Sequence, residues 1–419
     1  MTIKVRYNLR DLVRYLLCMI VLFLPVAIIA RTSFYSVTTP AAIWYKYKSF
    51  DFSILIVPVI LIALFIVRKS DAIRFHLVIL AIAIKDIIFF ALGLNNGAIP
   101  FDISMYLALI AAWAITVLAM KRNKEPVSAP GERFFDWYFW LAFCSMLLRL
   151  ALGMTTDGRY GAIGLSVGGT GFLAAIYFIY LLYVHKYNRF MPLALIVSFA
   201  TLVLSGQRTN LFFCVLFCIP YVLKKMVSKS NGNRKKTMVL WGLAFFGIIV
   251  ICAVIVLSEA GIKIAGMEYI TRMIDAVTKL FNGNLNEEMS VEGRFQSIEA
   301  GLDILRERPF GITNVFYDLQ HRMTLRNYPT FPHSGLLDCT LLWSTPIMLF
   351  CEIWLIKLMA GLAKKKSGMF WIVMYIQLIM IIWGGPFLEY PMLFIILLLL
   401  SMAKLITKRE KYRLQTIIT

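Results

Sequence analysis

Three arginines and one histidine stand in polar stretches of an otherwise apolar chain, and their side chains suit phosphate chemistry. Arg208 lies in the short stretch SGQRTN, Arg294 near the start of GRFQSIEAGLDILRERPFG, and His333 in NYPTFPHSGLLD before a long apolar run. Arg159 lies in the glycine-rich stretch TDGRYGAIGLSVGGTG. Arginine forks bind a diphosphate, and a histidine can take a proton from a hydroxyl near neutral pH. Together these side chains could hold a diphosphate and activate a hydroxyl.

Each of these residues also has a plainer interpretation. Arg208 could anchor to lipid phosphates at the membrane surface, and the glycines around Arg159 could simply form turns. Arg294 could be an exposed surface arginine, although an arginine at a helix N-terminus makes a good anion site. A lone histidine such as His333 is more often structural than catalytic. The functional interpretation depends on all four lying on one face of the membrane.

The sequence lacks the motifs that would indicate other kinds of chemistry. It has no GxxxxGK[ST] stretch, no HExxH and no C-x-x-C pair. We therefore expect no nucleotide site, no metal ion and no cofactor. A site of this kind could transfer a sugar from a lipid-diphosphate donor. An acceptor hydroxyl would attack the anomeric carbon and the lipid diphosphate would depart, which needs no ATP because the donor is already activated.

The elements that must position these residues are membrane helices. The chain has 419 residues, of which 60% are hydrophobic, and its mean hydropathy is +0.76. This composition predicts an all-α, polytopic membrane helix bundle. Twelve apolar runs approach the length of about 20 residues that a membrane-crossing helix needs. They cover residues 13–30, 52–67, 76–93, 103–120, 137–154, 170–184, 191–205, 211–223, 238–258, 340–360, 368–385 and 392–406.

The distribution of basic residues predicts the orientation of the chain. With the N-terminus inside, 27 Lys and Arg residues fall in inner segments. The short outer loops carry only Arg31, Lys46, Lys48, Arg159 and Arg208. The positive-inside rule then places both termini in the cytoplasm. It also accounts for the net charge of +20, so we expect membrane lipids and no nucleic acid as partners.

One outer segment is much longer than the others, and it divides the chain into three parts. Residues 1–258 form the first nine membrane helices, 259–339 a large outer loop, and 340–419 the last three helices with a basic cytoplasmic tail. A loop of this length in a compact protein is usually functional. Helical spacing of apolar residues predicts two amphipathic helices in it, over 268–281 and 293–311. The apolar positions of the second are Phe295, Ile298, Leu302 and Leu305.

Few charged residues interrupt the apolar runs. Asp86 lies beside Lys85, and Glu352 lies near Lys357. We interpret both as neutralised pairs or residues near helix ends, since a transporter would place more polar residues at mid-membrane.

In these features the chain resembles the bacterial O-antigen polymerase and O-antigen ligase superfamily. Its members have around twelve membrane helices and one large periplasmic loop late in the chain. SGQRTN with Arg208 is similar to their S-x-[ST]-R-like motif, and the stretch from Arg294 to RPFG resembles their arginine-led helix with a P-[FL]-x-G-like ending. PHSGLLD supplies His333, with Ser334 where the family often has Asn. The glycine-rich stretch with Arg159 is similar to another loop of the family.

The resemblance implies a metal-independent, inverting glycosyltransferase at the outer face of the bacterial cytoplasmic membrane. The donor would be an undecaprenyl-diphosphate-linked oligosaccharide, over which the large loop would close. His333 would be the general base, Arg208 and Arg294 would hold the diphosphate, and Arg159 would contact substrate. The arginines would stabilise the negative charge that develops on the leaving group.

Two acceptors fit this chemistry. A polymerase joins repeat units while both remain lipid-linked, and a ligase transfers the finished glycan to lipid A-core. We favour the polymerase, because that class is more numerous and because Ser334 replaces the Asn common in ligases. Chain-length regulator and flippase proteins are further partners to consider. A flippase or transporter function and a purely structural scaffold remain the alternatives from other classes.

Overall fold

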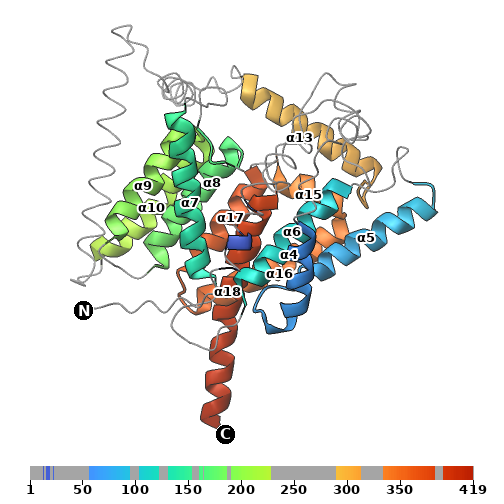
Figure 1. Cartoon of the computed structure of the whole chain (residues 1–419). Coiled ribbons are helices and arrows are strands. Elements are labelled where there is room, and N and C mark those ends of the chain that lie inside the picture. The colour runs from blue at the N-terminus through green and yellow to red at the C-terminus, as the bar shows by residue number, and fades with distance from the viewer. Residues whose placement is uncertain are drawn as a thin grey trace. The chain divides into compact units, whose positions relative to one another are not determined.

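The computed structural model describes twelve stretches of the chain (Figure 1). They are residues 13, 16–18, 22, 56–94, 103–121, 131–152, 160–163, 165–185, 190–227, 289–312, 334–382 and 390–418. Across these residues the regular structure is helical, with one isolated bridge between Ser70 and Lys121. The predicted all-α class is therefore confirmed for the described part of the chain.

The chain divides into two compact units. The first contains residues 1–140, 294–366 and 376–419, and the second contains 141–293 and 367–375. The first unit holds α4 (Ile56–Ile66), η2 (Val67–Lys69), α5 (His76–Ala91), α6 (Ile103–Ala119), the start of α7 (Glu132–Ala151), most of α13 (Met289–Glu307), α15 (Gly335–Trp343), α16 (Thr345–Lys364), the end of α17 (Met369–Ile382) and α18 (Tyr390–Ile418). The second holds the end of α7, then α8 (Val167–Tyr183), α9 (Met191–Leu204), α10 (Arg208–Val227) and the start of α17.

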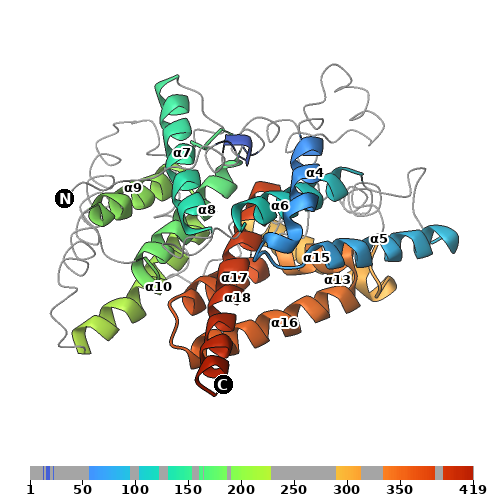
Figure 2. The same cartoon turned by 60° about the horizontal axis from the view of Figure 1, so that its bottom comes forward.

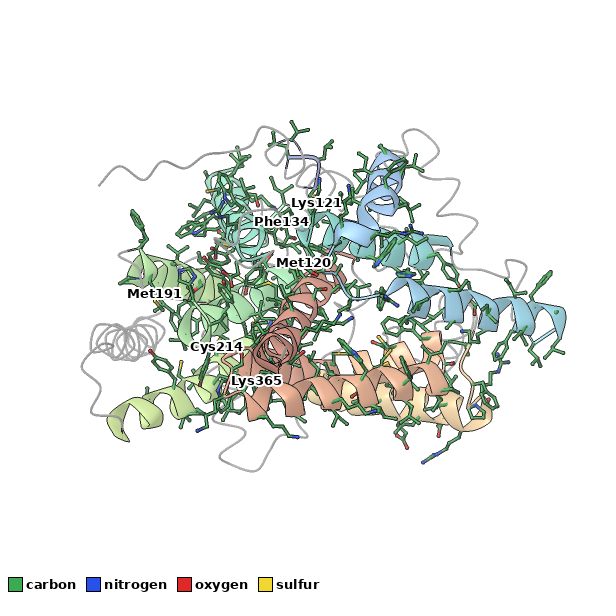
Figure 3. The ribbon with its side chains drawn as sticks, turned by 90° about the horizontal axis from the view of Figure 1, so that it is seen from below. Met120, Lys121, Phe134, Met191, Cys214 and Lys365 are labelled. Carbon is green, nitrogen blue, oxygen red and sulfur yellow. The ribbon has the colours of Figure 1, made fainter. Side chains whose placement is uncertain are left out.

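Aromatic side chains hold α7 against α18 in the core of the first unit. Phe134 and Tyr138 lie one helical turn apart and are fully buried. Both pack edge-to-face on Phe394, with ring centroids 5.6 and 5.7 Å away. Two apolar residues four positions apart present one face of a helix, so this pair fixes which side of α7 faces the core. Phe134 and the equally buried Met120 are labelled in Figure 3.

Helix α8 is the centre of the second unit, and α9 and α10 stay beside it in Figures 1 and 2. Nearly all of it is buried, and its first half is rich in glycine and alanine. Small residues let helix backbones approach closely, which is how membrane helices associate. The thiol of Cys214 on α10 reaches the carbonyl oxygen of Ala175 at 3.8 Å; Cys214 is labelled in Figure 3.

Most of the predicted apolar runs that fall on described residues form helices. Among the described residues, three segments are long and apolar enough to cross a membrane: Glu132–Ala151, Thr345–Lys364 and Pro391–Lys408. Several shorter apolar helices accompany them. The total of twelve crossings and the outer location of residues 259–339 stay predictions. The runs 238–258 and most of 13–30, and the amphipathic helix predicted over 268–281, lie outside the described residues.

The apolar helix predicted over residues 340–360 exists, but it begins at Thr345 and not at residue 340. The chain instead forms the short helix α15, breaks at Ser344 and continues as α16. Ser344 has φ +98°, a conformation that no α-helix interior allows. Pro346 follows in the first turn of α16, where its missing N–H and fixed φ are tolerated. The sequence signal for the break was this proline inside an apolar run.

The second amphipathic helix exists, but its start and its buried face differ from the prediction. Helix α13 begins at Met289 and ends at Glu307. Among the side chains that the structure describes on α13, Ser297, Ala300, Gly301 and Ile304 are buried, whereas Leu302 of the predicted apolar stripe is 42% exposed. Three of these four buried residues are small, and small residues allow close packing of helices.

Gly368, just before α17, offers a stability test of the second unit. A Cβ at this position would lie 1.9 Å from the carbonyl oxygen of Tyr183, which is backbone and cannot rotate away. We expect Gly368→Ala to lower the free energy of unfolding by about 1–3 kcal/mol, measured by thermal unfolding in detergent. Gly361→Ala is the control, since a Cβ there meets only Thr407 at 3.4 Å. Equal midpoints for the two variants would contradict the close approach.

Candidate functional site

The predicted site residues fall on both units, and none of their side chains is described. Arg159 and His333 lie outside the described residues. Arg208 is the first residue of α10 in the second unit, and Arg294 lies on α13 in the first. The site is therefore built below from the described residues that surround these four positions.

Two details of the predicted positions are corrected. Arg208 does not lie in a loop of about five residues, because only Ser205–Gln207 separate α9 from α10. Arg294 does not open its helix, because α13 begins at Met289, more than one turn earlier. An anion-binding role for Arg294 therefore cannot rest on the free N–H groups of the helix start.

Ser334, the residue that follows His333, has a defined place at the start of a helix. It is the N-cap of α15, and its side-chain oxygen accepts a hydrogen bond from the N–H of Leu337 at 3.4 Å. Ser334 is buried and has the extended backbone typical of an N-cap. His333 is thus the residue immediately before a capped helix. Asparagine caps helices as well as serine does, so a Ser for Asn replacement preserves this role.

The end of α13 is joined to α15 through the turn RPFG. Gly311 has φ +90°, and a Cβ on it would lie 2.3 Å from the carbonyl oxygen of Leu341. Only glycine fits both conditions. The next residue, Ile312, donates its N–H to the same Leu341 oxygen at 2.8 Å. The hydroxyl of Thr345 donates to the carbonyl of Pro309. The turn after the arginine-bearing helix therefore lies directly on the helix that follows His333.

A buried lysine on α5 stabilises the contact between the turn after α13 and helix α15, which we call the junction. The ammonium of Lys85 donates to the carbonyl oxygens of Leu342 at 2.7 Å and Ile312 at 3.0 Å. It also forms an ion pair with Asp86 at 2.8 Å, whose other oxygen accepts from the hydroxyl of Tyr106 at 2.5 Å. An ammonium has three N–H donors, and here all three have partners. The predicted Lys85–Asp86 pair is confirmed, and the pair has the additional role of holding two chain segments together.

The other predicted charge pair is wrong. The described residues give Glu352 a neutral partner, Gln377, whose amide nitrogen donates to Glu352 Oε2 at 2.6 Å. Lys357 is exposed. Residues five positions apart on a helix point in different directions, unlike residues three or four apart. Helix geometry therefore keeps Glu352 and Lys357 apart.

In the second unit, the glycine-rich segment packs against the turn that precedes Arg208. A Cβ on Gly171 would lie 2.6 Å from Gln207 and 2.7 Å from the hydroxyl of Ser205. At the other end of the segment, Tyr160 donates its N–H to the carbonyl of Leu204 at 3.2 Å. The neighbour of Arg159 thus contacts the end of α9, close in the chain to Arg208. The structure brings these two stretches together, as their common assignment to one site requires.

Hydrogen bonds within the glycine-rich segment set its path. Ser166 caps α8 by accepting from the N–H of Gly169 at 2.9 Å. The hydroxyl of Thr170 accepts from the N–H of Ala162 at 2.8 Å. Arg149 on α7 donates to the carbonyl of Gly161 at 3.1 Å. The segment is therefore a built loop with fixed backbone contacts, not merely a linker.

Asn210, in the same SGQRTN stretch, anchors the first turn of α10. It is fully buried, and its side-chain oxygen accepts from the hydroxyl of Tyr375 on α17 at 2.8 Å. Tyr375 in turn stacks on Phe172 of α8, with centroids 5.8 Å apart. This contact holds the backbone at Arg208 at a defined place in the unit.

The described residues contain no group of three or more His, Cys, Asp or Glu side chains that could hold a metal ion.

Residues 193–341 match a protein family described as O-antigen ligase. This match covers about a third of the chain and supports a relationship to the O-antigen ligase and polymerase superfamily. The matched range contains Arg208, Arg294 and His333 and does not reach Arg159. A search of curated proteins found no match. The family match and the apolar helices together support a membrane protein that processes glycans.

Sequence reasoning named Lys85 and Ser334 but missed the structural role of each. Lys85 carried a signal, because a lysine inside an apolar run needs acceptors, but its partners lie far away in the sequence. Ser334 carried the N-cap signal of a serine just before an apolar helix.

Replacing Lys85 tests the junction between α13 and α15. Lys85→Met leaves Asp86 buried without its cation and two carbonyls without donors. We expect it to lower the free energy of unfolding by about 3–5 kcal/mol and to reduce glycan production strongly. The double variant Lys85→Met with Asp86→Asn should recover part of the stability, because the uncompensated charge is gone. The control is Lys357→Met, an exposed lysine of another apolar helix. If Lys85→Met unfolds at the wild-type midpoint, the lysine does not lock the junction.

Proposed function

We propose that the protein is a membrane glycosyltransferase that polymerises undecaprenyl-diphosphate-linked repeat units at the outer face of the cytoplasmic membrane. The product would be an O-antigen or another surface polysaccharide. This proposal takes its substrate class from the superfamily and its site from the residues around Arg159, Arg208, Arg294 and His333.

The reaction needs one proton transfer and one displacement. His333 would take the proton of an acceptor hydroxyl as that oxygen attacks the anomeric carbon of the donor sugar. The bond from this carbon to the diphosphate breaks, and the lipid diphosphate leaves with the electron pair. Arg208 and Arg294 would stabilise the charge that develops on it, and Arg159 would contact the substrate. Attack from the side opposite the leaving group inverts the anomeric configuration.

The observation that carries this proposal is the Lys85-centred junction. It ties the turn after the helix bearing Arg294 to the helix that begins two residues after His333. A base and a phosphate-binding group must keep a fixed separation to act on one substrate. The packing of the glycine-rich segment on the turn before Arg208 supports the proposal in the second unit.

The ligase is the second candidate; one observation favours it, and another removes an argument for the polymerase. The matched family is described as O-antigen ligase. Ser334 has the capping role that asparagine would also fill, so its replacement of Asn does not argue for a polymerase. Both functions use the same donor and the same bond-breaking step, and they differ in the acceptor.

A complemented deletion strain tests the function. A strain that makes single repeat units on lipid A-core without the gene indicates a polymerase. Long chains that accumulate on undecaprenyl diphosphate, with none on the core, indicate a ligase. We expect His333→Ala to reduce the product about 100-fold or more, because a general base contributes at least that factor. Surface glycan on a gel and quantification of lipid-linked intermediates measure both.

Two variants serve as controls for this experiment. Arg306→Ala removes an arginine from the same helix as Arg294, but its side chain is 77% exposed and pairs with Asp303. Ser334→Asn keeps the N-cap. Both should retain the product and its class. Full activity of His333→Ala would remove the histidine from the mechanism, and a wild-type glycan profile in the deletion strain would overturn the glycosyltransferase assignment.

A further inference from the structure

The first unit contains an apolar cavity that the proposed reaction does not use. Its volume is about 250 Å³, and it lies among the start of α5, the end of α15, α16 and α18. Most of the side chains that line it are large and apolar, among them Trp343, Leu355, Leu397 and Leu400. Such a cavity suits a hydrocarbon chain.

The shape of the cavity fits one leaflet of a bilayer. Along α18 its lining runs from Leu393 to Lys404, a distance of about 16 Å at the helical rise per residue. Half of a bilayer's hydrocarbon core is about 15 Å thick. Two of its lining residues, Leu77 and Phe350, are 52% and 67% exposed. The cavity thus has an apolar rim through which an acyl chain could enter from the side.

Cations gather at one end of this cavity. Arg74 and Lys404 both line it, and Arg74 and Lys408 lie close enough to act on Lys404 as like charges. The N–H of Ile73, beside Arg74, donates to the hydroxyl of Ser401, one turn before Lys404, at 3.0 Å. Within the described residues, none of the three cations has an acidic partner. Three cations close together suit the phosphate of an anionic ligand.

The one carboxylate in the lining has a partner other than these cations. Glu352 lies on α16 and receives its hydrogen bond from Gln377. Its hydrogen-bond partner is thus a neutral amide and none of the three cations.

We propose that this cavity binds an acidic phospholipid of the inner leaflet. One acyl chain would fill the apolar part, and the headgroup phosphate would contact Arg74, Lys404 and Lys408. The positive-inside orientation places these residues on the cytoplasmic side, whereas the glycosyl transfer is proposed for the outer face. The occupant is thus a bilayer lipid and not the glycan donor, and the site does not depend on the proposed function.

Quenching of tryptophan fluorescence by acyl-brominated lipids tests the site in the full-length chain. Trp343 and Trp354 line the cavity, so a lipid chain inside it would quench them. In vesicles of brominated phosphatidylglycerol and phosphatidylcholine, we expect the wild type to prefer the acidic lipid at least fivefold. Arg74→Gln should reduce this preference about fivefold, which is the contribution of one basic residue at an anionic lipid surface. Lys364→Gln, an exposed lysine at the end of α16 that does not line the cavity, should leave it unchanged.

Further arms separate the possible sources of the signal. Trp354→Phe should remove part of the quenching without changing the thermal midpoint, which assigns the signal to the cavity. Excess inorganic phosphate should not abolish the preference, because the acyl chain contributes to binding. Equal quenching by both lipids, an unchanged preference in Arg74→Gln, or complete displacement by inorganic phosphate would each overturn the proposal.

Discussion

A lysine buried in an apolar helix must find hydrogen-bond acceptors, and those of Lys85 join the turn after α13 to the end of α15. An unpaired ammonium in an apolar interior costs several kcal/mol of folding free energy. The three partners of Lys85 must therefore lie close to it at the same time. One is the neighbouring Asp86, and the other two are carbonyls from the turn after α13 and from the end of α15. The carbonyl of Leu342 is one of the last four of α15. These carbonyls have no N–H donor within the helix, and the helix dipole favours a cation near them. The position of the helix that follows His333 depends on this interaction.

In the second unit, the segments next to the candidate arginines are held in place by uncharged groups. Its glycine-rich segment lies against the Ser205–Gln207 turn because Gly171 has no side chain to keep them apart. Close backbone approach, the N-cap at Ser166 and the buried contact between Asn210 and Tyr375 fix the backbone on either side of Arg208. The two units therefore use different physical means to give defined positions to segments that carry the candidate arginines. In both units, the supporting residues lie on helices or in the turns directly next to them.

The sequence could predict the helical class and most helix positions, because long apolar runs leave few alternatives. It predicted the Lys85–Asp86 pair because the two residues are adjacent. It could not predict the partners of Lys85, which lie 227 and 257 positions away in the chain. The helix break at Ser344 was missed because hydropathy does not register backbone dihedral angles, although Pro346 marked it. The buried face of α13 was missed because three of its four described buried residues, Ser297, Ala300 and Gly301, are small and leave no hydropathy signal.

The account claims that this one chain transfers a glycan from a lipid diphosphate without a metal ion. The most direct test uses the purified wild-type protein in proteoliposomes, with an undecaprenyl-diphosphate-linked oligosaccharide as the only glycan and a chelator present. We predict release of undecaprenyl diphosphate together with a new glycosidic bond of inverted anomeric configuration, both lost in His333→Ala. An unchanged donor that crosses the bilayer, with no diphosphate released, would contradict the account and indicate a transporter.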